Sequence, residues 1–283
     1  SLIDTDYRHR QPVVTSQRLQ ALHPDTGIPA WEIREAAILN PTIAQNGGLV
    51  FYIATNRRSQ TGRDPLETLL RSGARMVCRS LTDGSLVWES PLDAPNIASE
   101  NILFAVGADD RWLVVGSYVG ADNDSWYTLE CVDGTTGAWL WTAEHPKGKP
   151  GASTHGEQVH HPVVFPDGRL LAEPALYDLS SAARLLNSEG ATWVLSRPGP
   201  SCGTISASAQ CAFFRAANPT ALDISGALTG ASQPLALAPT RPGCWINIIP
   251  AGGLALIPEA SSGCVCHFSL QTSMAFKPSS TTP

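Results

Sequence analysis

The chain has 283 residues, of which 43% are hydrophobic and 16% charged, and this balance excludes the composition of a disordered protein. A formal net charge of -6, without any run of Lys or Arg, argues against nucleic-acid binding, which needs a basic surface. The 24 glycines and 22 prolines favour many short strands joined by turns, so we expect a mainly β protein.

The longest apolar stretches are too short to cross a bilayer. Residues 248–257 are interrupted by Pro250 and by the pair Gly252-Gly253, whereas a membrane-spanning helix needs about 20 apolar residues. We therefore expect no transmembrane segment in this chain.

Three segments in the first half of the chain align without gaps around a glycine that is followed four residues later by a tryptophan. The three pairs are Gly27 with Trp31, Gly84 with Trp88, and Gly137 with Trp141. Successive glycines are 57 and 53 residues apart, a spacing that suits one four-stranded blade of about 40 to 50 residues with loop insertions. The sequence therefore predicts a repeat architecture.

The third copy shows the local structure that we expect in each repeat. Residues 112–118 and 126–131 have the pattern of two strands, residues 133–137 that of a tight turn, and residues 138–141 that of a further strand. The glycine can take the positive φ that such a turn needs, and the tryptophan offers a flat surface for packing between sheets. Each repeat is thus expected to be a β-meander with its tryptophan buried at an equivalent position.

The order of strand, aspartate turn, glycine and tryptophan resembles the repeat of PQQ-type β-propellers. Residues 76–81 and 129–133 fit the strand that precedes the turn, and the resemblance extends over residues 15–145. That family includes the quinoprotein alcohol dehydrogenases and the propeller lipoprotein of the outer-membrane barrel-assembly machinery. The resemblance implies an all-β fold, namely a β-propeller of four-stranded blades.

Beyond residue 145 the repeat is degenerate. Residues 177–181 and 221–225 keep the aspartate of the turn but lose the tryptophan, and the 45 residues between Asp178 and Asp223 still fit one blade. Residues 202–215 and 242–266 resemble the C-terminal part of PQQ-like propeller proteins of planctomycete-type bacteria.

These patterns predict a single propeller domain over residues 1–283. Well-matched repeats occupy residues 15–145, degenerate cysteine-rich blades residues 146–276, and a polar tail residues 277–283. The length allows six or seven blades, with seven preferred. An open or partial propeller is the alternative architecture.

The seven cysteines indicate an oxidising compartment, because five of them fall in the last third of the chain. We therefore expect a periplasmic, cell-surface or secreted protein whose degenerate blades are stapled by at least two disulfides. The candidates for these disulfides are Cys202, Cys211, Cys244, Cys264 and Cys266. Cys78 and Cys131 occupy the same position of the repeat and are expected to stay reduced as small buried side chains.

The densest group of candidate ligands is the segment His155-Gly-Glu157-Gln-Val-His160-His161. Imidazole and carboxylate groups bind zinc, other divalent metals or haem, but the spacing matches no zinc signature. A hydrogen-bonded polar loop at the channel mouth is the alternative. If the protein has a cofactor site, we expect it at the channel end that bears His155, Glu157, His160 and His161, together with Arg215 from a neighbouring blade.

The sequence carries no familiar catalytic motif: it lacks a Gly-x-Ser-x-Gly elbow, a Walker loop, a Gly-x-Gly-x-x-Gly and a His-Glu-x-x-His. It also lacks the adjacent cysteine pair that the resemblance to quinoprotein dehydrogenases implies, so PQQ is not expected as a cofactor. We therefore expect a non-enzymatic propeller with protein partners, acting as an interaction platform or structural subunit. The alternative is a redox protein that uses quinone, haem or metal near His155–His161.

Overall fold

The computed structural model describes residues 12–58, 63–92, 102–108, 110–119, 125–144, 162–199, 201, 203–240, 242–243, 248–259 and 272–278. Within these ranges the chain forms strands and turns, with one short α-helix, α1 (Leu66–Leu70), and one 3-10 helix, η1 (Asn40–Thr42). The expectation of a mainly β protein is confirmed. No helix in the described ranges has the length and apolarity needed to span a membrane.

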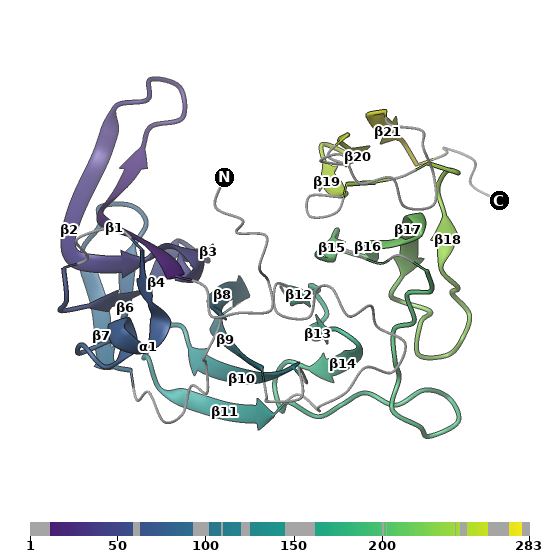
Figure 1. Ribbon diagram of the computed structural model, residues 1–283, viewed down its shortest axis with the longest axis horizontal. Helices are drawn as coiled ribbons and strands as arrows, with labels where there is room; N and C mark the ends of the chain where they lie inside the picture. Colours follow the sequence, from purple (N-terminus) through teal and green to yellow (C-terminus); the bar gives the residue numbers. More distant parts are fainter. Residues whose placement is uncertain are drawn as a thin grey trace. The chain divides into compact units, whose positions relative to one another are not determined.

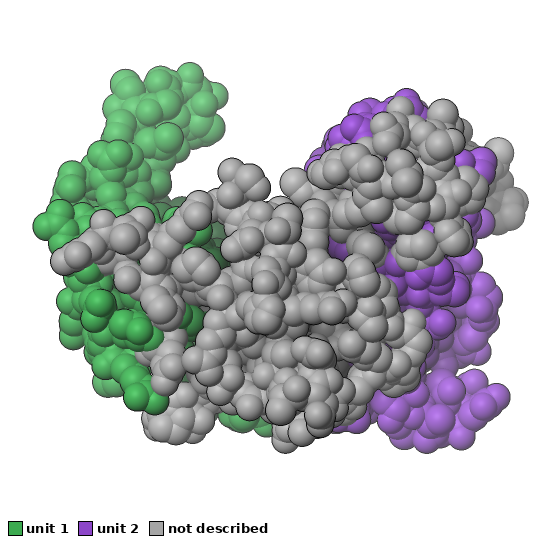
Figure 2. Space-filling view, in the orientation of Figure 1, with its two compact units in different colours: residues 1–148 green, residues 149–283 purple. Residues whose placement is uncertain are grey.

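The chain divides into two compact units, residues 1–148 and residues 149–283 (Figure 2). Both consist of small antiparallel sheets whose strands mostly follow one another along the chain (Figure 1). The single-domain organisation and the number of blades stay predictions.

The first unit holds a seven-stranded sheet of order β5-β1-β2-β4-β6-β7, in which β3 pairs with β4, and a four-stranded sheet of order β11-β10-β9-β8. The strands of the larger sheet are β1 (Pro12–Leu22), β2 (Pro29–Leu39), β3 (Ala44–Asn46), β4 (Leu49–Thr55), β5 (Arg63–Pro65), β6 (Arg75–Ser80) and β7 (Leu86–Pro91). Those of the smaller sheet are β8 (Ile102–Ala108), β9 (Arg111–Val119), β10 (Ser125–Asp133) and β11 (Trp139–Glu144). The smaller sheet is the meander expected for the third repeat.

The second unit holds three sheets, of order β12-β13-β14, β15-β16-β17-β18 and β19-β20-β21. The strands are β12 (Val163–Val164), β13 (Arg169–Ala172), β14 (Ala175–Asp178), β15 (Ser206–Ala207), β16 (Cys211–Ala216), β17 (Asn218–Asp223), β18 (Leu235–Ala236), β19 (Ile249–Ala251), β20 (Leu254–Ile257) and β21 (Met274–Phe276). Most of these strands have two to four residues and are shorter than most strands of the first unit, in keeping with the degenerate repeats of this half.

The same turn closes the last hairpin of each well-matched repeat. In the third copy the backbone N–H of Gly137 donates to the carbonyl of Asp133 at 2.9 Å, and the N–H of Asp133 donates to the carbonyl of Ala138 at 2.8 Å. Gly27 and Gly84 close the equivalent turns, and φ is 68°, 73° and 76° at the three glycines in chain order. The positive φ expected at these positions is therefore present in all three copies.

Each tryptophan of the repeat lies directly across from a small side chain on the neighbouring strand. The pairs are Trp31 with Ala21, Trp88 with Cys78, and Trp141 with Cys131, and the strand register shifts just after the small residue in every copy. The equivalent positions predicted for the tryptophans are thus confirmed. The three side chains are half-buried, however, and not fully buried as expected.

The tryptophan of one repeat docks on the turn of the next. The indole N–H of Trp88 donates to the carbonyl of Gly134 at 2.8 Å, and a Cβ placed on Gly137 would lie only 2.6 Å from the Trp88 ring. Trp31 makes the same hydrogen bond to the carbonyl of Leu81, also at 2.8 Å. The indole reaches a turn at the edge of the sheet, which explains why these rings are only half-buried.

The larger core cluster of the first unit is mostly aliphatic and includes an aromatic group around the fully buried Trp112. Its ring stacks on Phe51 with the centroids 5.4 Å apart, and lies 6.3 Å from the ring of Trp88. The Cys78 thiol lies beside this group, 3.7 Å from the carbonyl of Gly134. Trp112, which is not one of the repeat tryptophans, therefore also packs between sheets, in addition to Trp88.

Candidate functional site

The predicted ligand cluster falls outside the residues that the structure describes. His155, Glu157, His160 and His161 all lie in the range 145–161, so the metal, haem or redox alternative stays a prediction. Arg215 is described: it lies within strand β16, opposite Pro219, and is completely buried. In the described part of the chain no three His, Cys, Asp or Glu side chains come together as a metal site.

The cysteines divide into three groups. Cys78 and Cys131 are free and fully buried, as predicted, and burial raises the pKa of both thiols to about 12. Cys211 is also a free thiol in the structure, which does not bear out its assignment as a disulfide candidate. The other four candidates, Cys202, Cys244, Cys264 and Cys266, lie outside the described residues, and their disulfides stay a prediction.

A buried ion pair joins two loops of the second unit. The Arg197 guanidinium donates to both carboxylate oxygens of Glu173, at 2.6 and 2.5 Å, and also to the carbonyl of Gly203 at 3.3 Å. The two side chains are 1% and 2% exposed. A bidentate pair of this kind fixes geometry, so we assign it a structural role in holding Arg197 and Gly203 near the end of β13.

A second charged cluster lies across strands β2, β4 and β6 of the first unit. The Tyr52 hydroxyl donates to Glu35 at 3.1 Å and accepts from Arg79 at 2.8 Å, while Arg75 forms an ion pair with Glu35. Burial raises the pKa of Tyr52 to about 12, so the hydroxyl stays protonated. Each of these side chains has a hydrogen-bonding or ionic partner within the cluster, and these contacts join three strands.

The aspartate turn survives in the degenerate half even where its glycine is lost. The carboxylate of Asp178 accepts from the backbone N–H groups of Ser180 and Ser181, as that of Asp133 does in the third repeat. Ala182 takes the place of the turn glycine with φ of 60°. The side chain of aspartate therefore holds the turn in a conformation that alanine adopts only with strain.

Beside the sheet β12-β13-β14 the packing tryptophan comes from a different position in the sequence. The position that matches Trp88 and Trp141 is occupied by Leu186, which is 53% exposed. Seven residues later Trp193 packs against the neighbouring core, and its indole N–H donates to the carbonyl of Ala227 at 3.0 Å. The contact between a tryptophan and the next turn is thus kept, although the spacing of the repeat is not.

The sheet β15-β16-β17-β18 has a leucine at the tryptophan position. Ala221 precedes the turn that starts at Asp223 by two residues, as Cys131 precedes Asp133, and its partner across the strands is Leu235. Leu235 is 65% exposed. Leu237, which directly follows the end of β18, borders an open cleft.

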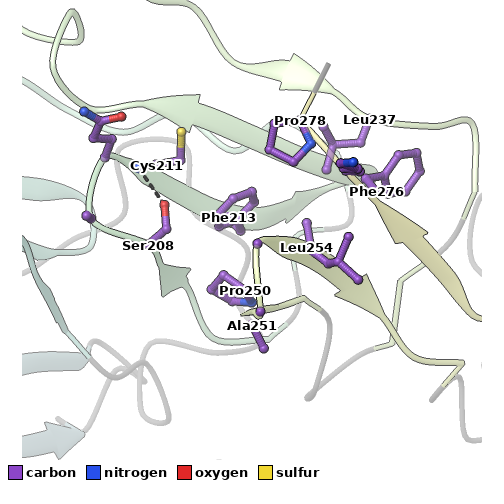
Figure 3. Close-up of a pocket in the computed structure, with 15 residues that line it drawn as sticks. Ser208, Cys211, Phe213, Leu237, Pro250, Ala251, Leu254, Phe276 and Pro278 are labelled. Atoms are coloured by element: carbon purple, nitrogen blue, oxygen red, sulfur yellow. Dashed lines mark hydrogen bonds between the residues drawn. The ribbon is translucent and has the colours of Figure 1, made fainter. Parts of the chain in front are cut away.

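This cleft, of about 610 Å³, lies between the sheets β15-β16-β17-β18 and β19-β20-β21 (Figure 3). The two sheets are joined on one side by a hydrogen bond of 2.7 Å from the Ser206 hydroxyl to the carbonyl of Ile248. The residues that line the cleft are mostly apolar or glycine: Ser208, Ala209, Gln210, Cys211, Phe213, Leu237, Pro250, Ala251, Gly252, Gly253, Leu254, Ala255, Phe276, Lys277 and Pro278. A volume of this size is typical of ligand-binding clefts.

The polar groups of the cleft are suited to binding and not to acid–base or nucleophilic chemistry. The Ser208 hydroxyl accepts from the backbone N–H of Cys211 at 3.2 Å and so closes the turn between β15 and β16. Burial and the nearby carboxylate of Asp223 raise the pKa of the Cys211 thiol, which is therefore neutral at pH 7. Among the described lining residues there is no histidine and no carboxylate, and Lys277 is the one charged group.

The cleft was not predicted, because no motif in the sequence marks it. The degenerate repeat at Asp223 has Leu235 where the earlier copies have tryptophan, and Leu235 is not among the residues that line the cleft.

No protein-family model matches the chain, and no curated protein matches its sequence. Solved structures do match, 39 chains in all. BamB from Moraxella catarrhalis has a TM-score of 0.52 and 13% identity, over 94% of this chain and 66% of that chain. A europium-containing methanol dehydrogenase has a TM-score of 0.39 and 10% identity, over 80% of this chain and 50% of that chain.

The chain therefore spans slightly less than two thirds of the length of the BamB chain. At this level of identity the similarity concerns the fold alone, and it supports a propeller-like architecture similar to that of BamB. The assignment to a planctomycete-type subfamily stays a prediction.

Proposed function

We propose that the protein is a non-enzymatic interaction scaffold, and that the cleft between β15-β16-β17-β18 and β19-β20-β21 is a site where it binds a partner protein. The observation that carries the proposal is the cleft itself, a mostly apolar space of about 610 Å³ whose lining includes the exposed Leu254. Exposed apolar surface costs free energy in water, and a concentration of it beside a cleft is typical of interaction sites.

The fold supports the same proposal. Propellers present loops and sheet edges on a rigid framework, and the family resemblance described above implies protein partners. Together with the cysteine content, that resemblance also supports a periplasmic, cell-surface or secreted location as part of the proposal.

The proposal is tested with random twelve-residue peptides displayed on phage and selected on the purified protein. We expect selected peptides to bind with Kd below about 100 µM, as measured by fluorescence anisotropy. Leu254, which is 36% exposed and lines the cleft, gives the test variant, Leu254→Glu. The matched control is Leu86→Glu on β7, where the leucine is 48% exposed and remote in sequence from the cleft residues.

Binding that is lost in Leu254→Glu and kept in Leu86→Glu supports a scaffold that binds through this cleft. Selection of no peptide above background, or equal binding by Leu254→Glu and the unsubstituted protein, overturns the proposal. Circular dichroism and the thermal midpoint establish that both variants are folded.

A further inference from the structure

The turn of the first repeat, residues 23–28, has the same backbone structure as the turns of the second and third repeats. The N–H of Gly27 donates to the carbonyl of His23 at 2.8 Å, and the N–H of His23 donates to the carbonyl of Ile28 at 2.9 Å. The other two turns have the same pair of bonds, at 2.8 or 2.9 Å, and φ of the three glycines lies between 68° and 76°. The three turns therefore offer equivalent surfaces.

In the second and third repeats a tryptophan ring covers the glycine of the turn. A Cβ placed on Gly84 would lie 2.9 Å from the ring of Trp31, and one placed on Gly137 would lie 2.6 Å from the ring of Trp88. In both cases the indole N–H donates at 2.8 Å to the carbonyl of the residue three places before the glycine. Each of these two turns is thus covered by one indole from the last strand of the preceding repeat.

The turn of the first repeat has both parts of this surface uncovered. A Cβ placed on Gly27 would meet no atom within 4 Å. The carbonyl three places before it belongs to Pro24, and no described residue donates a hydrogen bond to it. Residues 22–30 are all exposed, Leu22 at 55% and Ile28 at 62%, and the hairpin β1–β2 projects beyond the other strands of its sheet (Figure 1). An indole site that is occupied twice in this unit is therefore open at its first copy.

The described repeats have no further tryptophan for this turn. The degenerate repeats have Leu186 and Leu235 at the tryptophan position. The tryptophans whose side chains the structure describes are engaged on a following turn (Trp31, Trp88 and Trp193), in the core (Trp112 and Trp139) or with a further partner (Trp141). This favours another polypeptide as the source of an indole for the first turn.

We propose that the turn at residues 23–28 is a docking site for a partner protein, which binds through a tryptophan on an edge strand. The partner's ring covers Gly27, and its indole N–H donates to the carbonyl of Pro24, so that the partner continues the series of contacts between repeats. Apolar residues beside the tryptophan cover Leu22 or Ile28, whose exposed surface would otherwise stay in water. This surface belongs to the first unit, whereas the cleft belongs to the second, so the inference goes beyond the proposed function.

The test blocks this site with a single methyl group. The probes are disulfide-closed β-hairpin peptides with one fixed tryptophan and otherwise random residues, displayed on phage and selected on the purified protein. Gly27→Ala places a Cβ where the ring would lie, and we expect it to bind the selected peptides at least about tenfold more weakly, as measured by fluorescence anisotropy. The matched control is Gly190→Ala, because Gly190 is also exposed, has φ of 78° and has no atom within 4 Å of an added Cβ. It should bind them like the unsubstituted protein.

The peptides supply the second arm of the test, on the unsubstituted protein. Replacing the fixed tryptophan with alanine should weaken binding at least about tenfold. Replacing it with benzothienylalanine, which has the same shape but no N–H donor, should weaken binding about fivefold, because the hydrogen bond to the Pro24 carbonyl is then lost. Selection of no peptide, equal binding by Gly27→Ala and the unsubstituted protein, or peptides that do not need their tryptophan overturns the inference.

Two other occupants of the site have distinct signatures. If the chain covers its own turn, through Trp126 or Trp245, whose side chains the structure does not describe, Gly27→Ala lowers the thermal midpoint by more than Gly190→Ala does. If a second copy covers it, analytical ultracentrifugation detects a dimer that Gly27→Ala dissociates. Either result overturns the inference.

Failure here is distinguishable from failure of the scaffold proposal. Peptides that dock on the first turn bind Leu254→Glu as well as the unsubstituted protein, whereas peptides that occupy the cleft lose binding in Leu254→Glu and keep it in Gly27→Ala. The second pattern supports the cleft and overturns the docking site at the first turn.

Discussion

Replacing Gly137 with alanine is expected to destabilise the first unit strongly, because this glycine serves both the turn and the docked tryptophan. At φ of 76° an alanine costs about 1–2 kcal/mol. Alanine also lowers the conformational entropy of the unfolded chain, which offsets about 0.4–1 kcal/mol of this cost. The new Cβ would lie 2.6 Å from the Trp88 ring, and displacing a packed side chain costs about 1–3 kcal/mol. Loss of the indole hydrogen bond to Gly134 adds about 1 kcal/mol. The total is about 2–5 kcal/mol.

Gly27 supplies the matched control for this substitution. Its φ is 68°, close to that of Gly137, but a Cβ placed on it meets no atom within 4 Å. Gly27→Ala therefore lowers the free energy of unfolding only through the strained backbone conformation, by about 1 kcal/mol or less. The difference between the two variants, about 2–4 kcal/mol, isolates the contact with the tryptophan.

Urea unfolding followed by far-UV circular dichroism measures both free energies, and a double-mutant cycle with Trp88→Ala locates their origin. Once the indole is absent, Gly137→Ala should cost no more than Gly27→Ala. Equal costs for the two glycine substitutions in the unsubstituted background, or a Gly137→Ala cost that does not depend on Trp88, would refute the reasoning.

Three further outcomes follow from the same structure. Ala182→Gly should raise the free energy of unfolding by about 0.5–1 kcal/mol, since relief of the strain at φ of 60° exceeds the entropy cost of glycine; a lower urea midpoint would contradict this. Burial raises the pKa of Glu130 to about 7, so the folded state keeps a proton that the unfolded chain releases near pH 4.5. The free energy of unfolding therefore falls as the pH rises from 4.5 to 7, because the folded state then has to give up this proton or keep it against the solution. The advantage of Glu130→Gln over the unsubstituted protein should therefore grow by up to about 3 kcal/mol between pH 4.5 and 8, and a pH-independent difference in urea midpoints would exclude it. Cys78 and Cys131, with thiol pKa values raised to about 12, should resist iodoacetamide at pH 8 until the protein unfolds, and mass mapping of native protein that finds either alkylated at the rate of an exposed thiol would disprove it.

The repeat could be predicted from the sequence because its signals are local and keep their spacing. Gly84 and Trp88 are four residues apart in the chain, and both the turn and the strand that follows it depend on near neighbours alone. The partial exposure of Trp88 could not be predicted, since it depends on where the next repeat places the carbonyl of Gly134. That distance spans 46 residues and has no signature in the sequence.

The degenerate half was predictable only in its turns. Asp178 and Asp223 mark turns by a short-range hydrogen bond, which a single residue type reveals. Trp193 was not assigned to the repeat because an inserted hairpin moves it out of the regular spacing. The cleft beside Leu237 was missed for a different reason, because its lining comes from several strands and no motif or spacing in the sequence marks it.

The use of main-chain atoms as docking partners for Trp31 and Trp88 affects how such a chain evolves. The acceptors at Leu81 and Gly134 are backbone carbonyls, so the identity of the accepting residue contributes nothing to the hydrogen bond. A mutation in one repeat then requires no compensating mutation in its neighbour, apart from the glycine under the ring. A chain built in this way can keep its architecture while its sequence diverges, and a solved structure at 13% identity indeed has a similar fold.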